Sequence, residues 1–435
     1  MMQTCGFGKG MQSTMEHRQN AGDGPDTRSS PDAAEPPEHL RPRGSNQTGM
    51  RQFNERVVLQ AIRLNGSLPK AELARVTALS TQTVSLIINR LSDDGLVMKL
   101  APLRGRIGQP SVPIALKPDG AFSIGVKLGR RNLEVLLVDF TGTVRLRHTL
   151  GYRSPVPEQV FGCIAEQVRR MRDSLTPGQR DRIIGIGAAA PLSLGRWQEL
   201  IDPGTGQNES WDRIDIARRI ERDTGLPVQF AKDTAAACVA ELVAGRGRSV
   251  SSFMYLYVDT FIGGGVVIDS HLHAGLHGNA GAIGSLPTGL AGAGPGAPAQ
   301  LLSVASLLGL EQRLEQAGLD ATAAYDERAL QAPCQAATDA WMAQASNAIA
   351  MAITGASCLL DLEGIIIDGS CSGPLLARLI ERVVAALERY SWEGVQRPQV
   401  HAGTIGFDAS ALGGALLPLY ANFAPDRDLF LKLVI

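Results

Sequence analysis

The first regular pattern of apolar residues begins shortly after residue 50. Residues 52–65 place large apolar side chains near helical spacing, and Gly66-Ser67 ends the run. The apolar positions of this predicted helix are Phe53, Val57, Leu59, Ile62 and Leu64. Residues 1–48 are instead rich in Gly, Pro, Ser, Asp and Arg and show no apolar period, which predicts a disordered tail. Met50 precedes the first helix, and a start-codon artefact is one interpretation of the tail.

Two shorter helical patterns follow the first helix. The run KAELARVTAL is expected to bury Leu73, Ala74 and Val76. A third run starts after Ser80 and continues through VSLIINRLSDDGLV. Its expected core positions are Leu86, Ile87 and Leu91. Three helices with a tight turn before the third predict a helix-turn-helix.

A pair of short apolar runs after the third helix predicts a β-hairpin. Residues 96–100 and 112–116 are typical of two strands, and the basic loop PLRGRIGQP lies between them. Such a hairpin is the wing of a winged helix. We therefore expect a winged helix-turn-helix domain over residues 49–118.

From residue 119 to residue 435, strand patterns and helix patterns alternate. A predicted three-stranded meander leads into a helix at about 157–175, the buried strand IIGIGAAAP and the strand VQFAK, which ends at Asp233. Residues 252–270 predict a hairpin with glycines at its crown, and helices and the strand GIIID follow. This alternation predicts an α/β part with two lobes. Ligands in such folds bind beyond the carboxyl ends of the strands.

Overall composition is ordinary for a soluble globular protein. The chain has 435 residues, with 44% hydrophobic and 20% charged residues, and a typical domain size of about 150 residues implies two to three domains. Its six cysteines stand far apart without any CxxC pair, which is typical of reduced thiols. The apolar stretch from Trp341 to Leu360 contains several polar residues and predicts a buried helix. We expect a cytoplasmic protein without a membrane partner.

Charge is distributed unevenly along a chain whose formal net charge is only −1. Residues 51–118 carry ten Lys and Arg residues and four acids, a local net charge of +6, and the remainder is therefore negative. A basic module of this kind is suited to meeting phosphates. The competing interpretation is a protein-interaction domain whose basic residues form a solvated face.

The third helix and the wing hold the candidate DNA-binding residues. The first turns of the helix are expected nearest to the base edges, because the recognition helix lies in the major groove, and the wing is expected at the minor groove. The helix candidates are Thr81, Gln82, Thr83, Ser85, Asn89 and Arg90, and the wing candidates are Arg104, Arg106 and Gln109. The expected partner is double-stranded DNA with an A/T-rich inverted repeat, bound by a homodimer.

The order of these segments resembles the ROK family of sugar-responsive transcriptional repressors and sugar kinases. The resemblance covers roughly residues 50–425 and rests on NERVVLQAIRLNGSLPKAELARVTALSTQTVSLIINRLSDDGLV, FAKDTAAACVAE, TFIGGGVVIDSHLHAGLHGNAGAIGS and IIIDGS. It implies an actin-like, two-lobed fold. It also implies that residues 119–435 sense a small molecule related to carbohydrate metabolism.

Departures from the family pattern fall on the residues that serve catalysis and metal binding. The family's D-x-G-G-T turn, which holds ATP phosphates, is replaced by Lys127-Leu128-Gly129-Arg130-Arg131, although three cations here are still able to attract an anion. The family's cysteine-rich zinc motif is absent from SLPTGLAGAGPGAPAQLL. We therefore expect no cofactor, no metal and no enzymatic activity; the alternative is a sugar kinase that kept its N-terminal extension.

The family's sugar-contacting residues are only partly retained. Ala282 and Ser285 stand where the family has Glu and His. Lys232 stands where the family has Asn and precedes Asp233, which resembles the catalytic aspartate and is equally suited to cap the next helix. The predicted ligand-binding set is Asn208, Lys232, Asp233, His277 and Ser285. Lys232 favours a carboxylated or phosphorylated sugar over a neutral one.

Trp211 follows Asn208 closely, as a Trp does near the sugar-touching Asn of the family, and is interpreted as core packing. The chain is thus predicted to be a ROK-family transcriptional regulator, most simply a repressor, with a catalytically silent sensing domain.

Overall fold

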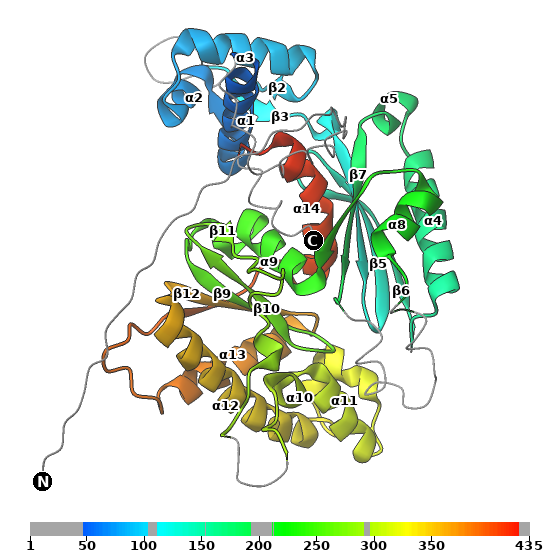
Figure 1. The fold of residues 1–435 in the computed structure, drawn as a ribbon, viewed down its shortest axis with the longest axis vertical. Coiled ribbons are helices and arrows are strands. Elements are labelled where there is room, and N and C mark those ends of the chain that lie inside the picture. The colour runs from blue at the N-terminus through cyan, green and yellow to red at the C-terminus, as the bar shows by residue number, and fades with distance from the viewer. Residues whose placement is uncertain are drawn as a thin grey trace, which may run out of the picture. The chain divides into compact units, whose positions relative to one another are not determined.

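A computed structural model describes residues 47–102, 111–152, 154–192, 211, 213–290 and 296–425. It confirms the predicted fold class: a small helical domain with a three-stranded sheet precedes an α/β part with two five-stranded sheets (Figure 1). The described residues from Met50 onward belong to one compact unit. Most of the predicted tail, 1–46, and most of the predicted wing loop, 103–110, lie outside the described residues.

The N-terminal domain has the predicted order of three helices and a hairpin. Its elements are α1 (Gln47–Asn65), β1 (Ser67–Pro69), α2 (Lys70–Thr77), α3 (Thr81–Asp93), β2 (Val97–Lys99) and β3 (Pro113–Leu116). The strands pair antiparallel in the order β1-β3-β2, so the segment between the first two helices adds an edge strand to the hairpin. The core of this domain includes Val58, Leu59, Ile62, Leu73, Val84, Ile88 and Leu91.

Two of the predicted core positions in this domain, Val76 and Leu86, are wrong, and two other apolar positions of the first predicted helix are exposed as well. Phe53, Leu64, Val76 and Leu86 are 50%, 46%, 44% and 59% exposed. In α3 the buried stripe runs through positions 84, 87, 88 and 91, which places Leu86 on the opposite face. An apolar residue beside a narrow core stripe is thus easily assigned to the wrong side of a helix.

The first sheet confirms the predicted meander. Strands β4 (Phe122–Leu128), β5 (Asn132–Asp139) and β6 (Val144–Gly151) pair antiparallel, and β7 (Ile183–Ala190) and β8 (Val228–Lys232) extend the sheet in parallel. The strand order is β6-β5-β4-β7-β8. Helices α4 (Pro157–Asp173), α5 (Pro177–Arg180) and α8 (Ile216–Thr224) lie to one side of this sheet, and α14 (Ala409–Phe423) covers the other face (Figure 1).

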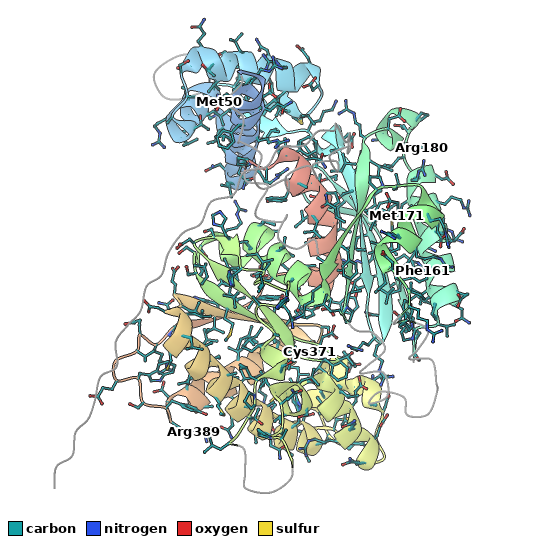
Figure 2. The ribbon with its side chains drawn as sticks, in the orientation of Figure 1. Met50, Phe161, Met171, Arg180, Cys371 and Arg389 are labelled. Atoms are coloured by element: carbon teal, nitrogen blue, oxygen red, sulfur yellow. The ribbon has the colours of Figure 1, made fainter. Side chains whose placement is uncertain are left out.

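Alternation along β4 explains these two layers. Ile124 and Val126 pack in the same cluster as Phe161 of α4, which Figure 2 labels. Gly125 faces α14, where a Cβ atom would lie 2.1 Å from the carbonyl oxygen of Ala411. The helix therefore approaches the sheet more closely than any larger residue allows.

The second sheet has the order β11-β10-β9-β12-β13. Its strands are β9 (Phe253–Val258), β10 (Gly263–Ile268), β11 (His271–Leu272), β12 (Gly364–Gly369) and β13 (Gln399–Ala402). The predicted glycine hairpin is β9–β10, whereas β13 was not predicted. Helices α10 (Leu301–Ala305), α11 (Leu307–Gln316), α12 (Gln335–Leu360) and α13 (Gly373–Leu387) belong to this lobe. Short 3-10 turns occur at Pro118–Gly120, Arg246–Arg248, Ile283–Ser285, Ala321–Tyr325, Glu327–Leu330 and Gly406–Asp408.

Helix α12 contains the apolar stretch that the sequence predicts to be buried. By length and composition alone it is one candidate membrane span among the described residues. Its Trp341 is buried and donates from Nε1 to the carbonyl of Ser306 at 3.1 Å, whereas Leu359 is 84% exposed. The helix packs against α10 and α13, which fits a core helix of this lobe.

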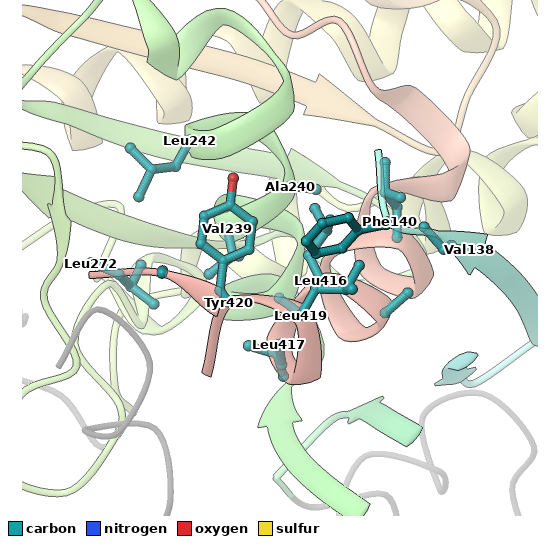
Figure 3. Packing of buried hydrophobic residues seen from close by; sticks show 14 of the residues in the cluster. Val138, Phe140, Val239, Ala240, Leu242, Leu272, Leu416, Leu417, Leu419 and Tyr420 are labelled. Carbon is teal, nitrogen blue, oxygen red and sulfur yellow. The ribbon is translucent and has the colours of Figure 1, made fainter. Parts of the chain in front are cut away.

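Helices α9 (Asp233–Ala244) and α14 pack together between the two sheets. A Cβ atom on Gly413 would lie 1.7 Å from the carbonyl oxygen of Ala236, so the two backbones touch. Figure 3 shows the apolar cluster at this packing, with Leu416 and Tyr420 of α14 near Val239 and Ala240 of α9. On its other side α9 contacts β10.

Candidate DNA interface and candidate ligand cleft

The candidate recognition helix α3 begins at Thr81, as predicted. Ser80 is its N-cap, and the Ser80 side chain accepts a hydrogen bond from the Thr83 backbone N–H at 3.1 Å. The hydroxyls of Ser80 and Thr83 lie 2.8 Å apart. The Thr83 side chain therefore takes part in fixing the start of the helix.

The outer face of α3 is polar at its start and open to solvent. Thr81, Gln82 and Asn89 are exposed, and Ser85 is partly exposed. Leu86 lies one turn from Gln82 and Asn89 and is exposed as well. This face offers amide and hydroxyl groups together with one large apolar side chain, which matches the groups that contact base edges and thymine methyls.

The remaining predicted DNA contacts have different surroundings. Arg90, in the last turn of α3, forms an ion pair with Glu55 of α1. This pair fixes α3 against α1 and competes with a phosphate for the guanidinium. Arg104, Arg106 and Gln109 lie outside the described residues.

At the candidate ligand cleft, the end of β4 carries a buried lysine. Lys127 is 1% exposed. Its Nζ atom lies 3.2 Å from Glu134 Oε1 on β5 and 3.3 Å from Asp259 Oδ2 after β9. Burial opposes the lysine's charge, but the carboxylates of Asp259 and Glu134 outweigh it and hold the Lys127 pKa well above its usual range. Lys127 therefore stays charged.

Asp259 connects this lysine to the second sheet. Its Oδ1 atom accepts hydrogen bonds from Ser370 Oγ at 2.6 Å, at the end of β12, and from the Thr260 N–H at 2.7 Å. Burial raises the pKa of Asp259, but Lys127 and these hydrogen bonds more than offset this effect and hold it below its usual value. One ion pair thus joins the ends of β4 and β9, which belong to different sheets.

The two arginines of the replaced turn also have protein partners. The guanidinium of Arg130 lies 4.7 Å from the centre of the Phe261 ring, and burial lowers the pKa of Arg130 to about 10. Arg131 pairs with Glu311 of α11 at 2.9 Å. Protein carboxylates thus already pair with Lys127 and Arg131, and attraction of an anion by this turn stays a prediction.

The predicted sugar-binding residues are only partly brought together. Lys232 ends β8, and its Nζ atom donates to Asn279 Oδ1 at 2.9 Å, which joins the first lobe to the loop after β11. Burial lowers the pKa of Lys232. His277, in that loop, and Ser285 are exposed, and Asn208 lies outside the described residues.

Asp233 is the first residue of α9, but its side chain does not cap the helix from the N-cap position, which Lys232 occupies. Its Oδ1 atom accepts a hydrogen bond from the Thr234 N–H at 2.7 Å. Burial raises the pKa of Asp233, and the charges of Arg130 and Lys232 oppose that shift. The carboxylate therefore lies among cations in the cleft.

Trp211 is a core residue, as predicted. It is 5% exposed, its Nε1 atom donates to the carbonyl of Pro155 at 2.8 Å, and its ring centre lies 5.7 Å from that of Phe161. Among the described residues, no group of three His, Cys, Asp or Glu side chains is placed to hold a metal ion.

Reasoning from the sequence missed the partners of the three cations. Asp259 and Phe261 flank Thr260 just before the glycine run of the hairpin, and Glu311 lies on α11. One signal was available: a lysine at the end of a buried strand requires a carboxylate partner, because an unpaired buried charge is costly. Nothing in the spacing indicates which carboxylate that is.

Comparison with known proteins assigns both parts of the chain. The model of the ROK family matches residues 123–420, and a model described as winged helix-turn-helix DNA-binding matches residues 54–98. The xylose repressor of Bacillus subtilis is 25% identical over 242 residues, which are 56% of this chain and 62% of the repressor. The match thus spans less than two thirds of that repressor. An uncharacterized protein of Sinorhizobium fredii, y4fQ, is 25% identical over 384 residues, 85% of this chain and 92% of that protein.

Solved structures show the same fold. A ROK family transcriptional regulator described as a homolog of the E. coli MLC protein has a TM-score of 0.61 at 21% identity, covering 88% of this chain and 99% of that one. A ROK hexokinase from Thermus thermophilus has a TM-score of 0.52 at 24% identity, covering 68% and 97% of the two chains. The hexokinase match covers a smaller share of this chain than the regulator match does. This chain belongs to the ROK family and carries a winged helix-turn-helix domain ahead of its ROK domain.

Proposed function

We propose that this chain is a DNA-binding transcriptional regulator whose ROK domain senses a small molecule and does not transfer phosphate. The observation that carries the proposal is the exposed polar face of α3, with Thr81, Gln82 and Asn89, on a domain of net charge +6. A helix of this kind contacts the edges of the bases, and the basic side chains of the domain contact phosphates. The xylose repressors among the relatives support a role as repressor.

The ion pair in the cleft supports the absence of phosphotransfer. In the turn where the family's kinases hold ATP phosphates, Lys127 is held by Glu134 and Asp259, and Arg130 packs on Phe261. Asp259 also places a carboxylate beside this turn, which repels the phosphates of a nucleoside triphosphate. The competing function is a sugar kinase, and an assay of ADP release with common hexoses tests it. Sugar-dependent ADP release would overturn the proposal.

The proposed DNA target is an A/T-rich inverted repeat near carbohydrate genes, bound by a cytoplasmic homodimer. The proposed contacts are the α3 residues together with Arg104, Arg106 and Gln109 of the wing. A single winged domain contacts few base pairs, and a dimer doubles the number of base pairs contacted because it binds two half-sites. Light scattering after size-exclusion chromatography measures the oligomeric state directly.

The test of DNA binding is selection of genomic fragments by the purified full chain, followed by fluorescence anisotropy on the enriched sequence. Gln82→Ala is expected to weaken binding by about 1–3 kcal/mol and to relax the sequence preference at one position. The double variant Arg104→Ala/Arg106→Ala is expected to weaken binding to all sequences and to reduce the salt dependence. Arg169→Ala on α4 is a control that leaves affinity unchanged. Retention of no particular sequence would contradict the proposal.

For the sensing domain we propose a carboxylated or phosphorylated sugar as effector, contacted by Lys232, Asp233, Ser285, His277 and Asn208. Lys232 supports this choice because it places a cation at the end of β8. Calorimetry with neutral hexoses, sugar acids and sugar phosphates tests it. Tighter binding of neutral hexoses than of sugar acids and sugar phosphates, in both the unmodified chain and Lys232→Asn, would rule out the proposed role of Lys232 in binding an acidic group.

A further inference from the structure

Two arginines outside the cleft, Arg63 and Arg248, lie where the DNA-binding domain contacts the ROK domain. Arg63, in the last turn of α1, places its guanidinium 4.9 Å from the ring centre of Tyr420 on α14 and 5.3 Å from that of Phe140 after β5. Figure 3 shows both rings in the apolar cluster around α14. Arg248, after α9, donates from Nη2 to the carbonyl of Leu64 at the end of α1. We call this contact region the junction.

A pocket of about 190 Å³ lies at the junction. Its lining residues are Arg63, Phe140, Thr141, Gly142, Val243, Ala244, Arg248, Leu416, Leu419 and Tyr420. Two are arginines, none is an acid, and most of the others are apolar. The volume is below the roughly 300–1,000 Å³ of sites for drug-sized ligands, so it suits a small ion or group.

The guanidinium of Arg63 is only partly satisfied by the residues that the structure describes. Its Nη1 and Nη2 atoms are buried and have no hydrogen-bond partner at bonding geometry among the described residues, although the Tyr420 side chain interacts with the guanidinium. No carboxylate among the described residues lies within ion-pair distance of Arg63 or Arg248. Burial lowers the pKa of Arg63, with Tyr420 as a weaker opposing influence. Buried guanidinium groups are normally paired with an anion, and the described part of the chain places no carboxylate beside this one.

The acid nearest in sequence to the pocket lining is already engaged. Asp139 lies at the end of β5, directly before Phe140. Its Oδ2 atom accepts from Arg145 at 3.1 Å, and its Oδ1 atom accepts from the N–H groups of Thr141 and Thr143. It therefore belongs to the turn and does not neutralise Arg63.

We propose that the junction pocket binds a small oxyanion, inorganic phosphate or the phosphoryl group of a small metabolite, between Arg63 and Arg248. Guanidinium groups bind such oxyanions through paired N–H donors, and the two aromatic rings fix the plane of Arg63 so that little side-chain freedom is lost on binding. The bound anion contacts α1 through Arg63 and the segment after α9 through Arg248. It thereby bridges the DNA-binding domain and the ROK domain, whatever ligand the cleft takes.

Calorimetry on the full chain with inorganic phosphate and with glycerol 3-phosphate tests this proposal, against sodium chloride at equal ionic strength. Both phosphate compounds are expected to bind and chloride is not. Tighter binding of inorganic phosphate would assign the site to the free ion, and tighter binding of glycerol 3-phosphate to a phosphorylated metabolite. Either result supports the oxyanion site. Absence of binding by both would overturn it.

Substitutions at the junction locate the site. Arg248→Gln is expected to weaken phosphate binding at least about tenfold, as loss of a charged hydrogen bond does. Arg248 is exposed, so this variant is expected to fold. Arg63→Gln should weaken binding further, and Arg63→Lys should retain part of it.

Arg182 provides a matched control at another contact between the two domains. Its Nη2 atom donates to the Asp94 carbonyl of the DNA-binding domain at 3.1 Å, and its Nη1 atom donates to the Gly120 carbonyl at 2.8 Å. It joins the two domains but does not line the pocket. Arg182→Gln should keep phosphate binding, and equal losses in Arg182→Gln and Arg248→Gln would overturn the assignment.

Discussion

Replacing Lys127 with methionine tests whether the cleft ion pair holds the two lobes together. Methionine has similar length and is apolar, so the change removes the charge with little change in volume. The carboxylates of Glu134 and Asp259 then repel each other, because no cation lies between them. In addition, Glu134 Oε2 already has no hydrogen-bond partner among the described residues. Removing one partner of a buried pair costs about 3–5 kcal/mol. An unfolding entropy of about 2.1 cal/mol/K per residue gives about 1 °C per kcal/mol for a chain of this length, so the midpoint of thermal unfolding should fall by roughly 3–6 °C.

The pH dependence of this loss identifies its cause. Burial raises the pKa of Glu134 in the native protein, with Lys127 opposing the shift, so without the lysine this pKa rises further. A carboxyl group whose pKa is higher in the folded state than in the unfolded state stabilises the fold most at a pH below its unfolded-state pKa. This contribution to the free energy of unfolding is lost as the pH rises through the folded-state pKa. The difference in midpoint between Lys127→Met and the unmodified chain should therefore be smaller at pH 5 than at pH 8.

Differential scanning calorimetry at these two pH values measures the difference. Arg169→Met, which removes an exposed ion pair with Glu166, controls for loss of a surface charge and should change the midpoint far less. A loss of stability in Lys127→Met that is the same at both pH values, or no loss at all, would refute the role assigned to the buried pair.

Further predictions concern packing and thiol reactivity. Gly413→Ala places a Cβ atom against the Ala236 carbonyl and should lower stability in urea by about 1–3 kcal/mol, whereas Gly162→Ala, with open space around its Cβ, should be neutral or stabilising; equal effects would contradict the packing of α14 on α9. Among the cysteines that the structure describes, Ellman's reagent should react first with the exposed Cys358, because burial raises the pKa of Cys371 to about 12 and raises that of Cys238 as well. Rapid labelling of Cys238 in the native protein would show that α9 opens readily.

The order of elements was predictable because apolar periodicity and turn residues are local signals. The helix-turn-helix, the meander and the glycine hairpin all follow from them. The strand β13 was missed because Gln399–Ala402 is short and only partly buried, so it lacks a strong apolar pattern. Leu86 was assigned to the core because periodicity finds a helix but does not fix which side of a narrow stripe a residue occupies.

For each of these contacts in the candidate cleft, the sequence predicted the basic residue but not its partner. Lys127, Arg130 and Lys232 were recognised as departures from the family pattern, but their partners Asp259, Phe261 and Asn279 lie far along the chain. Pairing between such distant positions depends on how α9 and α14 bring the two sheets together. The junction arginines Arg63 and Arg248 gave no signal, because single basic residues in the last turn of a helix or in the turn after one are ordinary.

The two helices between the sheets provide a physical connection between the cleft and the junction. Helix α9 begins at Asp233 in the cleft and ends at Ala244, which lines the junction pocket. The segment before α14 places Phe407 5.4 Å from Lys127 Nζ, and Tyr420 near the other end of α14 contacts Arg63. Because their backbones touch at Gly413 and Ala236, the helices cannot slide without repacking. A hundredfold change in DNA affinity requires about 2.7 kcal/mol of coupling, so a ligand in the cleft has to differ by that amount in its free energy of binding to the two arrangements of these helices.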